Sequence, residues 1–354
     1  MSDLWRVIAG LFRRDEPVAP YVKISLPMVA VGLGLISPDL KDAALSFLNK
    51  TLGLGLSLDT PWWIGACLVA IGVIIFFIGF LTDLRTDPGR FIAIRHQSFK
   101  PLTAELPNEA LPKRLRKRKI VTLSCDQSNF LTGGVCDPIG AVRQQQQLAN
   151  EIVGNLKTDP AAILGYYGIV HIPLQFLAGC SVSTHPKVAL FELERATSSW
   201  RELENSAGLD LEVMVTRTTN PEFPIACAIR IAVSYPVKSS DVDEVVPAPY
   251  RDYSISIAKP TIDAVTTYDQ VNAIVEALRR TLDEIHNELP SNLVVHLFYS
   301  GPVSVGFSLG RTISRTIHNR VIVYNYTSST KPAYAWGVEV TKERPPQEMV
   351  VNNT

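Results

Sequence analysis

Hydrophobic positions in the N-terminal quarter of the chain form long apolar runs. The run WWIGACLVAIGVIIFFIGFL, residues 62–81, has 20 residues without a charge, enough to cross a bilayer core of ~30 Å at ~1.5 Å per residue. The run ISLPMVAVGLGLIS, residues 24–37, is shorter and contains Pro27. It predicts a short or tilted span over about 21–38, with a re-entrant or interfacial segment as the alternative. We therefore assign residues 1–90 to a two-helix transmembrane region.

Charges around the two runs predict their orientation. Arginines and lysines precede the first run and follow the second, whereas the loop between them has only Lys41 and Lys50. Because cytoplasmic flanks carry an excess of Lys and Arg, we expect a multi-pass protein with both termini in the cytoplasm. Within the second run, Gly65, Gly72 and Gly79 recur every seven residues, about two helical turns. They should line one face that packs against another helix in lipid.

A proline-rich and basic stretch follows, and we interpret residues 91–118 as a linker. PLTAELPNEALP, residues 101–112, has three prolines, and KRLRKRK, residues 113–119, has six basic residues in seven. The basic run could bind anionic lipid or nucleic acid, or it could be a solvated face leading into a strand. It starts about thirty residues after the second apolar run, which is far for a juxtamembrane segment.

From residue 119 onward, strand-like and helix-like segments alternate, and their order recurs. KIVTLSCDQ, residues 119–127, predicts a strand, and residues 137–157 predict a helix with an aspartate as its N-cap and a proline at its first position. DYSISIAKP, residues 252–260, and the segment 267–289 repeat that pair. We interpret this as one βαβ-type unit used twice.

The repeat divides the predicted α/β domain, residues 119–345, into halves of about 119–245 and 250–345. Between the repeated segments, DLEVMVTRTT and PIACAIRIAVSYPV predict an antiparallel hairpin around Asn220-Pro221.

Composition and motifs indicate no catalytic chemistry. The chain has 34 basic and 34 acidic residues, so its net charge favours no partner. Its five cysteines form no CxxC pair and are expected to be reduced. GxxxxGK[ST] and HExxH are missing. We expect no catalytic residues, no metal site and no cofactor.

Four predicted strand ends could form a ligand site. In open α/β sheets, ligands bind beyond the carboxyl ends of the strands, where helix N-termini present free N–H groups. The four ends are CDQSNF, VHIP, AKPT and YSGPVS, and two related halves would place them around one shared cleft. Hydrogen-bonding, cationic and stacking side chains are available there for a phosphate-linked ligand. The candidate ligand contacts are Asp126, Asn129, Phe130, His171, Trp200, Lys259, Ser300, Ser304, Arg311, Tyr326 and Tyr334.

The second half carries a family resemblance. VVHLFYSGPVSVGFSLGRTI, followed by RVIVYNY and a late Tyr-Trp segment, resembles the SAVED domain, and the likeness extends over about residues 119–340. SAVED domains resemble two fused CARF-like Rossmann units. The resemblance therefore implies an α/β fold of two such units, preceded here by an N-terminal two-helix transmembrane hairpin. That arrangement is similar to the transmembrane SAVED effectors of CBASS antiphage systems.

The resemblance also implies a function. SAVED domains bind a cyclic oligonucleotide, typically a cyclic trinucleotide, made by a partner cGAS/DncV-like nucleotidyltransferase. We therefore expect a non-enzymatic receptor of the bacterial inner membrane that forms a homo-oligomer on ligand binding. It would then disrupt the lipid bilayer in abortive infection. Two alternatives stay open: a membrane-anchored ring nuclease that degrades a cyclic oligonucleotide, and a non-catalytic membrane scaffold.

Overall fold

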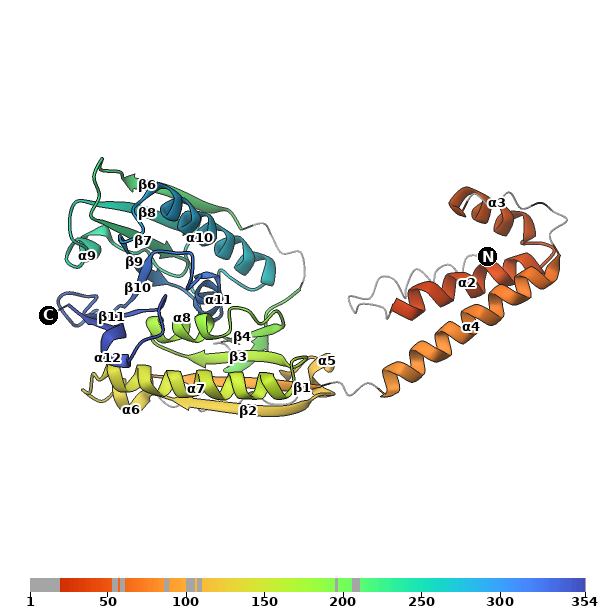
Figure 1. Cartoon of the computed structure of the whole chain (residues 1–354), viewed down its shortest axis with the longest axis horizontal. Coiled ribbons are helices and arrows are strands. Elements are labelled where there is room, and N and C mark those ends of the chain that lie inside the picture. Colours follow the sequence, from red (N-terminus) through yellow and green to blue (C-terminus); the bar gives the residue numbers. More distant parts are fainter. Residues whose placement is uncertain are drawn as a thin grey trace. The chain divides into compact units, whose positions relative to one another are not determined.

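The computed structural model contains two compact units, residues 1–87 and 88–354 (Figure 1). It describes residues 20–52, 57, 61–85, 89–99, 106, 110–194, 197–205 and 211–353.

The first unit is helical. Because the glycines on α2 and α4 carry no side chain, the two helices approach closely in antiparallel fashion: a Cβ atom on Gly65 would lie 2.6 Å from the carbonyl oxygen of Gly32. Gly72 and Gly79 lie on the same face of α4 and also meet α2. The helices are α2 (Pro20–Ile36), α3 (Lys41–Leu52) and α4 (Trp62–Arg85).

Among the described residues, one helix is long and apolar enough to cross a membrane, over Trp62–Leu81 of α4. It leaves large apolar side chains uncovered, including Phe77 at 56% and Ile78 at 61% exposure. The first predicted span does form α2, but its 17 residues reach only ~25 Å at ~1.5 Å per residue. The predicted multi-pass topology is therefore not supported, because α2 is shorter than the ~30 Å hydrocarbon core.

A five-stranded sheet opens the second unit, with strand order β2-β1-β3-β4-β5. Strands β1 to β4 run parallel and β5 is antiparallel to β4. As predicted, Asp137 caps α7, accepting a 2.9 Å hydrogen bond from the Gly140 backbone N–H. The elements are β1 (Arg90–Gln97), α5 (Lys113–Arg116), β2 (Lys119–Asp126), α6 (Ser128–Leu131), α7 (Pro138–Thr158), β3 (Ile163–Ile169), α8 (Ile172–Ser181), β4 (Val188–Glu194) and β5 (Ser199–Glu202).

A seven-stranded sheet follows, with strand order β12-β11-β10-β9-β7-β8-β6. Strands β8, β7, β9 and β10 are parallel neighbours, and the flanking strands pair antiparallel. A capping box between Thr267 and Gln270 starts the long helix α10. The elements are β6 (Val213–Thr219), β7 (Ala226–Ala232), α9 (Ser239–Asp243), β8 (Tyr250–Ile257), α10 (Tyr268–Glu288), β9 (Val294–Ser300), α11 (Val303–Thr312), β10 (Arg320–Asn325), β11 (Trp336–Glu339), α12 (Pro346–Met349) and β12 (Val350–Asn352).

The predicted fold class is confirmed, because the two sheets repeat one α/β unit. The order β2-β1-β3-β4-β5 recurs as β8-β7-β9-β10-β11, with α7 and α8 matched by α10 and α11. Helices α8 and α11 pack against each other between the sheets (Figure 1). A Cβ atom on Gly179 would collide with the carbonyl of Phe307, and one on Gly310 with the carbonyl of Phe176. The same glycine contact is therefore made twice, once from each half.

The repeat begins one strand earlier than the sequence pattern indicates. Strand β1 falls within the predicted linker 91–118, yet it pairs with both β2 and β3 inside the first sheet. Its arginines, Arg90 and Arg95, resemble the charged flank of a membrane span, and that likeness conceals the strand. The linker assignment is wrong for these residues.

The predicted hairpin is also wrong. Strand β6 pairs antiparallel with β8, whereas β7 pairs in parallel with β8 and β9. Residues 213–245 therefore belong to the second half rather than to a first half of 119–245. Two adjacent strand-like runs fit a hairpin by local pattern alone, but β7 is the equivalent of β1 and lies inside its sheet, between β9 and β8. Beyond the predicted end at residue 345, β12 adds an edge strand.

Candidate ligand-binding site

A cavity of about 1030 Å³ lies between the two halves of the second unit. It opens where parallel strands end: Ile169 closes β3, Glu194 closes β4 and Ser300 closes β9. Because the carboxyl ends of parallel strands leave backbone groups and loops free to meet a ligand, this is where an open α/β sheet is expected to bind one. Both halves contribute to the wall.

The first half contributes an acidic wall. Glu192 and Glu194 come from the end of β4, and Arg201 comes from β5. The Glu192 carboxylate accepts a 2.8 Å hydrogen bond from the backbone N–H of Ser304, in the first turn of α11. An anion is favoured at a helix N-terminus, so this resident carboxylate already occupies the position predicted for a ligand phosphate. It also joins the two halves directly beside the cavity.

The second half contributes aromatic and basic side chains. The segment after β7 carries Tyr235, 57% exposed, and Lys238. Tyr326 is 45% exposed, and its ring packs edge-on against that of Tyr334 with the centroids 5.4 Å apart. Exposed tyrosine rings lining a cavity can stack on nucleobases. Within the described part of the chain, Lys238 forms no ion pair, so its charge is available to a ligand.

The cavity holds more acidic than basic side chains. Four carboxylates line it, against the guanidinium of Arg201 and the ammonium of Lys238. Arg201 is 3.1 Å from Glu204, which reduces its attraction for another anion. An anionic ligand would therefore place its charge near Lys238 and its hydrogen-bond donors toward the carboxylates. The four carboxylates belong to Glu192, Glu194, Asp241 and Asp263.

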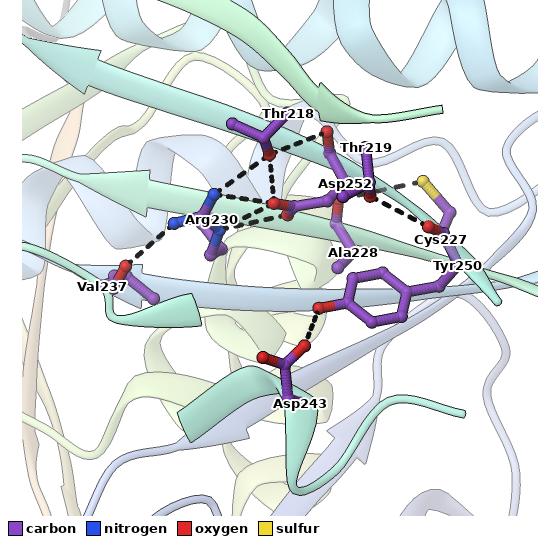
Figure 2. A network of polar contacts seen from close by, with 9 residues as sticks. All are labelled: Thr218, Thr219, Cys227, Ala228, Arg230, Val237, Asp243, Tyr250 and Asp252. Carbon is purple, nitrogen blue, oxygen red and sulfur yellow. Dashed lines mark hydrogen bonds and ion pairs between the residues drawn. The ribbon is translucent and has the colours of Figure 1, made fainter. Parts of the chain in front are cut away.

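A buried ion pair supports the loop that carries Lys238 (Figure 2). Arg230 on β7 and Asp252 on β8 are 2.7 Å apart, with side chains 13% and 4% exposed. The same guanidinium donates a 3.2 Å hydrogen bond to the carbonyl of Val237 in the cavity wall. Because the bonds fix both ends of the guanidinium, Arg230 positions this loop without lining the cavity.

A second contact in Figure 2 holds the short helix of the same wall. The Tyr250 hydroxyl donates a 2.5 Å hydrogen bond to the carboxylate of Asp243 at the end of α9. Burial, and then the neighbouring Asp243 carboxylate, raise the pKa of Tyr250 well above its usual range, so the hydroxyl keeps its proton.

Three of the predicted ligand residues line the cavity: Ser300, Tyr326 and Tyr334. Ser304 lies just behind the wall, fully buried, and its hydroxyl has no hydrogen-bond partner. Arg311 lines a separate cavity of about 360 Å³ and donates a 2.5 Å hydrogen bond to the carbonyl of His185. Burial lowers the pKa of Arg311. Its position on the last turn of α11 carries it away from the cavity at the other end of the helix.

The remaining predictions lie outside the cavity. Trp200 is 2% exposed and packs edge-on against Tyr167 in a hydrophobic cluster of the first sheet. Lys259 follows β8 and is exposed, but the cavity wall begins after it, at Ile262. The other four are also absent from the lining: Asp126 ends β2, Asn129 and Phe130 lie on α6, and His171 precedes α8.

A polar network fills the ends of β1 and β2 in the first half. His96 at the end of β1 is fully buried and lies 2.9 Å from the Tyr166 hydroxyl and 2.8 Å from the Gln127 amide oxygen. Burial lowers its pKa to about 4, although the hydrogen bond to Gln127 opposes this. Beside it, Ser98 bonds to the Nδ1 atom of His171 at 2.6 Å. None of these side chains lines the cavity.

Most of the lining was not predicted from sequence, including Tyr235 and the charged residues Glu192, Glu194, Arg201, Lys238, Asp241 and Asp263. The sequence does contain a signal for Lys238. The segment SYPVK follows β7, and a loop that follows a parallel strand is where a ligand is expected to bind. The hairpin interpretation of β7 concealed it. Among the described residues, no group of three or more His, Cys, Asp or Glu side chains is placed to hold a metal ion.

The geometry defines a class of protein: a duplicated α/β domain with one cavity at its strand ends. The family model for the SMODS-associated and fused to various effectors sensor domain, SAVED, matches residues 144–340. The match extends over more than half of the chain, and the protein belongs to the SAVED family.

Solved structures similar to this chain include two receptors. One is the Acinetobacter baumannii Cap4 SAVED/CARF-domain containing receptor with the cyclic trinucleotide 2'3'3'-cAAA, at 12% identity and a TM-score of 0.46, covering 92% of this chain and 82% of that chain. Another is the Moraxella osloensis Cap4 SAVED/CARF-domain containing receptor, at 11% identity and a TM-score of 0.42, covering 83% of this chain and 64% of that chain. No curated protein matches the chain by sequence.

Proposed function

We propose that this protein is a membrane-anchored receptor-effector whose cavity binds a cyclic oligonucleotide, with a cyclic trinucleotide as the preferred ligand. The observation that carries the proposal is the cavity of about 1030 Å³ built by the strand ends of both halves, in a member of a sensor-domain family. A cavity of this size is at the upper end of those that enclose small ligands, which suits several linked nucleotides.

The lining supplies each interaction that such a ligand needs. Lys238 meets phosphate, while Tyr235 and Tyr326 stack on bases. The carboxylates of Glu194 and Asp263 accept hydrogen bonds from base N–H groups. Bases that carry an exocyclic amine, such as adenine, are therefore preferred over uracil. Because Glu192 already occupies the N-terminus of α11, phosphates bind on the Lys238 side.

The effector step follows from the N-terminal unit. Helix α4 anchors the protein in the bacterial inner membrane, and ligand binding drives homo-oligomerisation that disrupts the bilayer. The glycine face of α4 is already covered by α2, so contacts between protomers use other surfaces unless the two helices separate. The ligand comes from a cGAS/DncV-like nucleotidyltransferase, in a CBASS response that ends in abortive infection.

Calorimetric titration of the full chain in nanodiscs tests the ligand claim. The panel contains cyclic di- and trinucleotides, including 2'3'3'-cAAA and 3'3'3'-cAAA, with linear trinucleotides as controls. We expect saturable binding of at least one cyclic trinucleotide, weakened about tenfold by Lys238→Gln and unchanged by Lys342→Gln, a similarly exposed lysine outside the cavity. Absence of heat with every cyclic ligand would sink the proposal.

The same titrated sample tests the non-enzymatic part of the proposal. Chromatography after overnight incubation should return the cyclic ligand intact. A ring-opened product that depends on the protein would favour the ring nuclease instead. Dye leakage from vesicles that contain the full chain, measured with and without ligand, tests membrane disruption independently.

A further inference from the structure

The basic run KRLRKRK forms a defined edge of the second unit. Leu111 and Leu115 are 2% and 0% exposed and anchor α5 in a hydrophobic cluster of the first sheet. With α5 held there, the side chains of Lys113, Lys117 and Lys119 are exposed. The run is therefore a fixed surface and not a flexible tail.

Strand pairing places the end of this run next to the first strand of the domain. Lys119, the first residue of β2, is the register partner of Arg90, the first residue of β1. Arg90 in turn follows the last residue of α4, Arg85, after only residues 86–89. Such a tether spans at most ~18 Å when fully extended. The run thus follows α4 by about thirty residues in sequence but lies beside the point where the chain enters the domain from α4.

Two of the six basic side chains are bonded within the fold. Arg116 donates a hydrogen bond to the carbonyl of Leu111. Arg114 pairs with the carboxylate of Glu202 on β5. Lys113, Lys117 and Lys119, by contrast, form no ion pair within the described residues. An alternative explanation is that lysines on an edge strand prevent strand pairing between copies and have no further role. That explanation applies to Lys119 on β2. It does not apply to Lys113 on α5 or to Lys117 just after it, because both lie outside the strand.

We infer that this basic edge, residues 113–119, binds anionic phospholipid headgroups. Cytoplasmic leaflets carry negative surface potential, which attracts basic side chains within a Debye length of ~8 Å. Residues 86–89 join β1 directly to α4, so the chain can bring this edge to the membrane surface. The inference rests on α4 spanning a membrane, which is part of the proposed function. Its consequence is a preferred orientation of the sensor domain on the membrane.

Vesicle co-sedimentation of residues 88–354 tests the edge without α4. This fragment is suitable because its three hydrophobic clusters contain no residue from the first unit, so it has its own core. The probes are vesicles of phosphatidylcholine alone and with 30% phosphatidylglycerol. We expect binding only to the anionic vesicles, weakened about tenfold by Lys117→Gln with Lys119→Gln. The matched double variant, Lys331→Gln with Lys342→Gln, removes two exposed lysines elsewhere and should bind like the parent.

Two results would overturn the inference. Equal loss of vesicle binding in both double variants would assign the effect to net charge rather than to this edge. Binding to a random-sequence RNA or DNA oligonucleotide that exceeds vesicle binding at matched phosphate and physiological salt would assign the edge to nucleic acid. Flotation of the full chain with neutral vesicles reports on α4 alone, so a failure of anchoring is distinguishable from a failure of the basic edge.

Discussion

The two halves share one backbone plan but differ at their strand ends. Strands β2-β1-β3-β4-β5 and β8-β7-β9-β10-β11 have the same order and directions. In the first half, buried His96, Gln127 and Ser98 fill the ends of β1 and β2. In the second half, the ends of β7, β9 and β10 open on the cavity. Duplication therefore supplied two equivalent edges that are used differently: in the first half only the ends of β3 and β4 reach the cavity, whereas the ends of β1 and β2 are packed.

One pair of equivalent positions in the two halves shows how the halves differ. Arg95 on β1 and Arg230 on β7 are equivalent: their register partners are Ser124 and Ser254. Arg230 pairs with Asp252, toward the start of β8, and its remaining nitrogen reaches the cavity loop. Arg95 instead faces the end of β2.

At that end of β2 the acidic partner is Asp126. Burial opposes ionisation there, but hydrogen bonds from Ser128 and the positive charge of Arg95 lower the pKa of Asp126. Arg230 thus supports a loop of the cavity, whereas Arg95 lies near a carboxylate outside it.

The largest expected effect comes from breaking the support of that cavity loop. Arg230→Met leaves the Asp252 carboxylate, 4% exposed, without its partner. We expect the free energy of unfolding to fall by about 3–5 kcal/mol, measured by urea denaturation. Arg217→Met, at an arginine whose side chain is 32% exposed, is the control and should cost at most about 1 kcal/mol. Similar losses in the two variants would refute the supporting role of Arg230.

The contact between the halves gives the next effect. Valine at Gly179 or Gly310 would force a side chain into a backbone carbonyl of the facing helix. We expect each variant to lose about 3 kcal/mol of stability, and the two losses to agree because the contacts are equivalent. Gly154→Ala, on an exposed site of α7 with nothing within 4 Å, should instead gain up to about 1 kcal/mol. Thermal and urea unfolding measure all three, and unequal losses would mean that the halves are not packed symmetrically.

Acid should destabilise the protein through its buried histidines. Burial lowers the pKa of His96 and of His171 to about 4, whereas an unfolded histidine titrates near ~6.5. Between these values the unfolded state binds protons that the folded state does not, so the free energy of unfolding decreases as the pH is lowered. Each histidine contributes a slope of about 1.4 kcal/mol per pH unit, which vanishes above pH ~6.5.

Denaturation at pH 7, 6, 5 and 4.5 measures that slope. His96→Gln should remove the contribution of His96 to the slope over this pH range. Above pH 7 the stability of the variant should not depend on the protonation of histidines. His296 on β9, whose pKa burial also lowers to about 4, retains its own contribution in the variant. An unchanged slope would show that His96 titrates normally.

The smallest expected effect on stability comes from Ser304, whose side chain lies just behind the cavity wall. The Ser304 hydroxyl is buried without a hydrogen-bond partner, and only its backbone N–H meets Glu192. Ser304→Ala should therefore be neutral or stabilising by about 1 kcal/mol and leave ligand affinity unchanged. Glu192→Gln, by contrast, should alter affinity. A loss of affinity in Ser304→Ala would place the hydroxyl in the ligand site after all.

Local patterns in the sequence determined much of the fold. Asp137 with its following proline, and Thr267 with Gln270, predict the starts of α7 and α10 from interactions within four residues. The repeat was visible for the same reason, since helix caps and strand alternation depend on near neighbours. Of the three predicted residues that line the cavity, Ser300 followed from the rule that ligands bind at strand ends, whereas Tyr326 and Tyr334 were predicted as side chains that can stack on bases.

Only the tertiary structure decided which strand ends matter. The parallel pairing of β7 with β8 and β9, and the place of β1 inside its sheet, join segments far apart in the chain. No local pattern encodes such pairings, because a strand-like run satisfies several partners equally well. The structure therefore decided that the end of β1 is filled by His96, that Arg311 turns away from the cavity, and that the basic run returns to the entry of the domain.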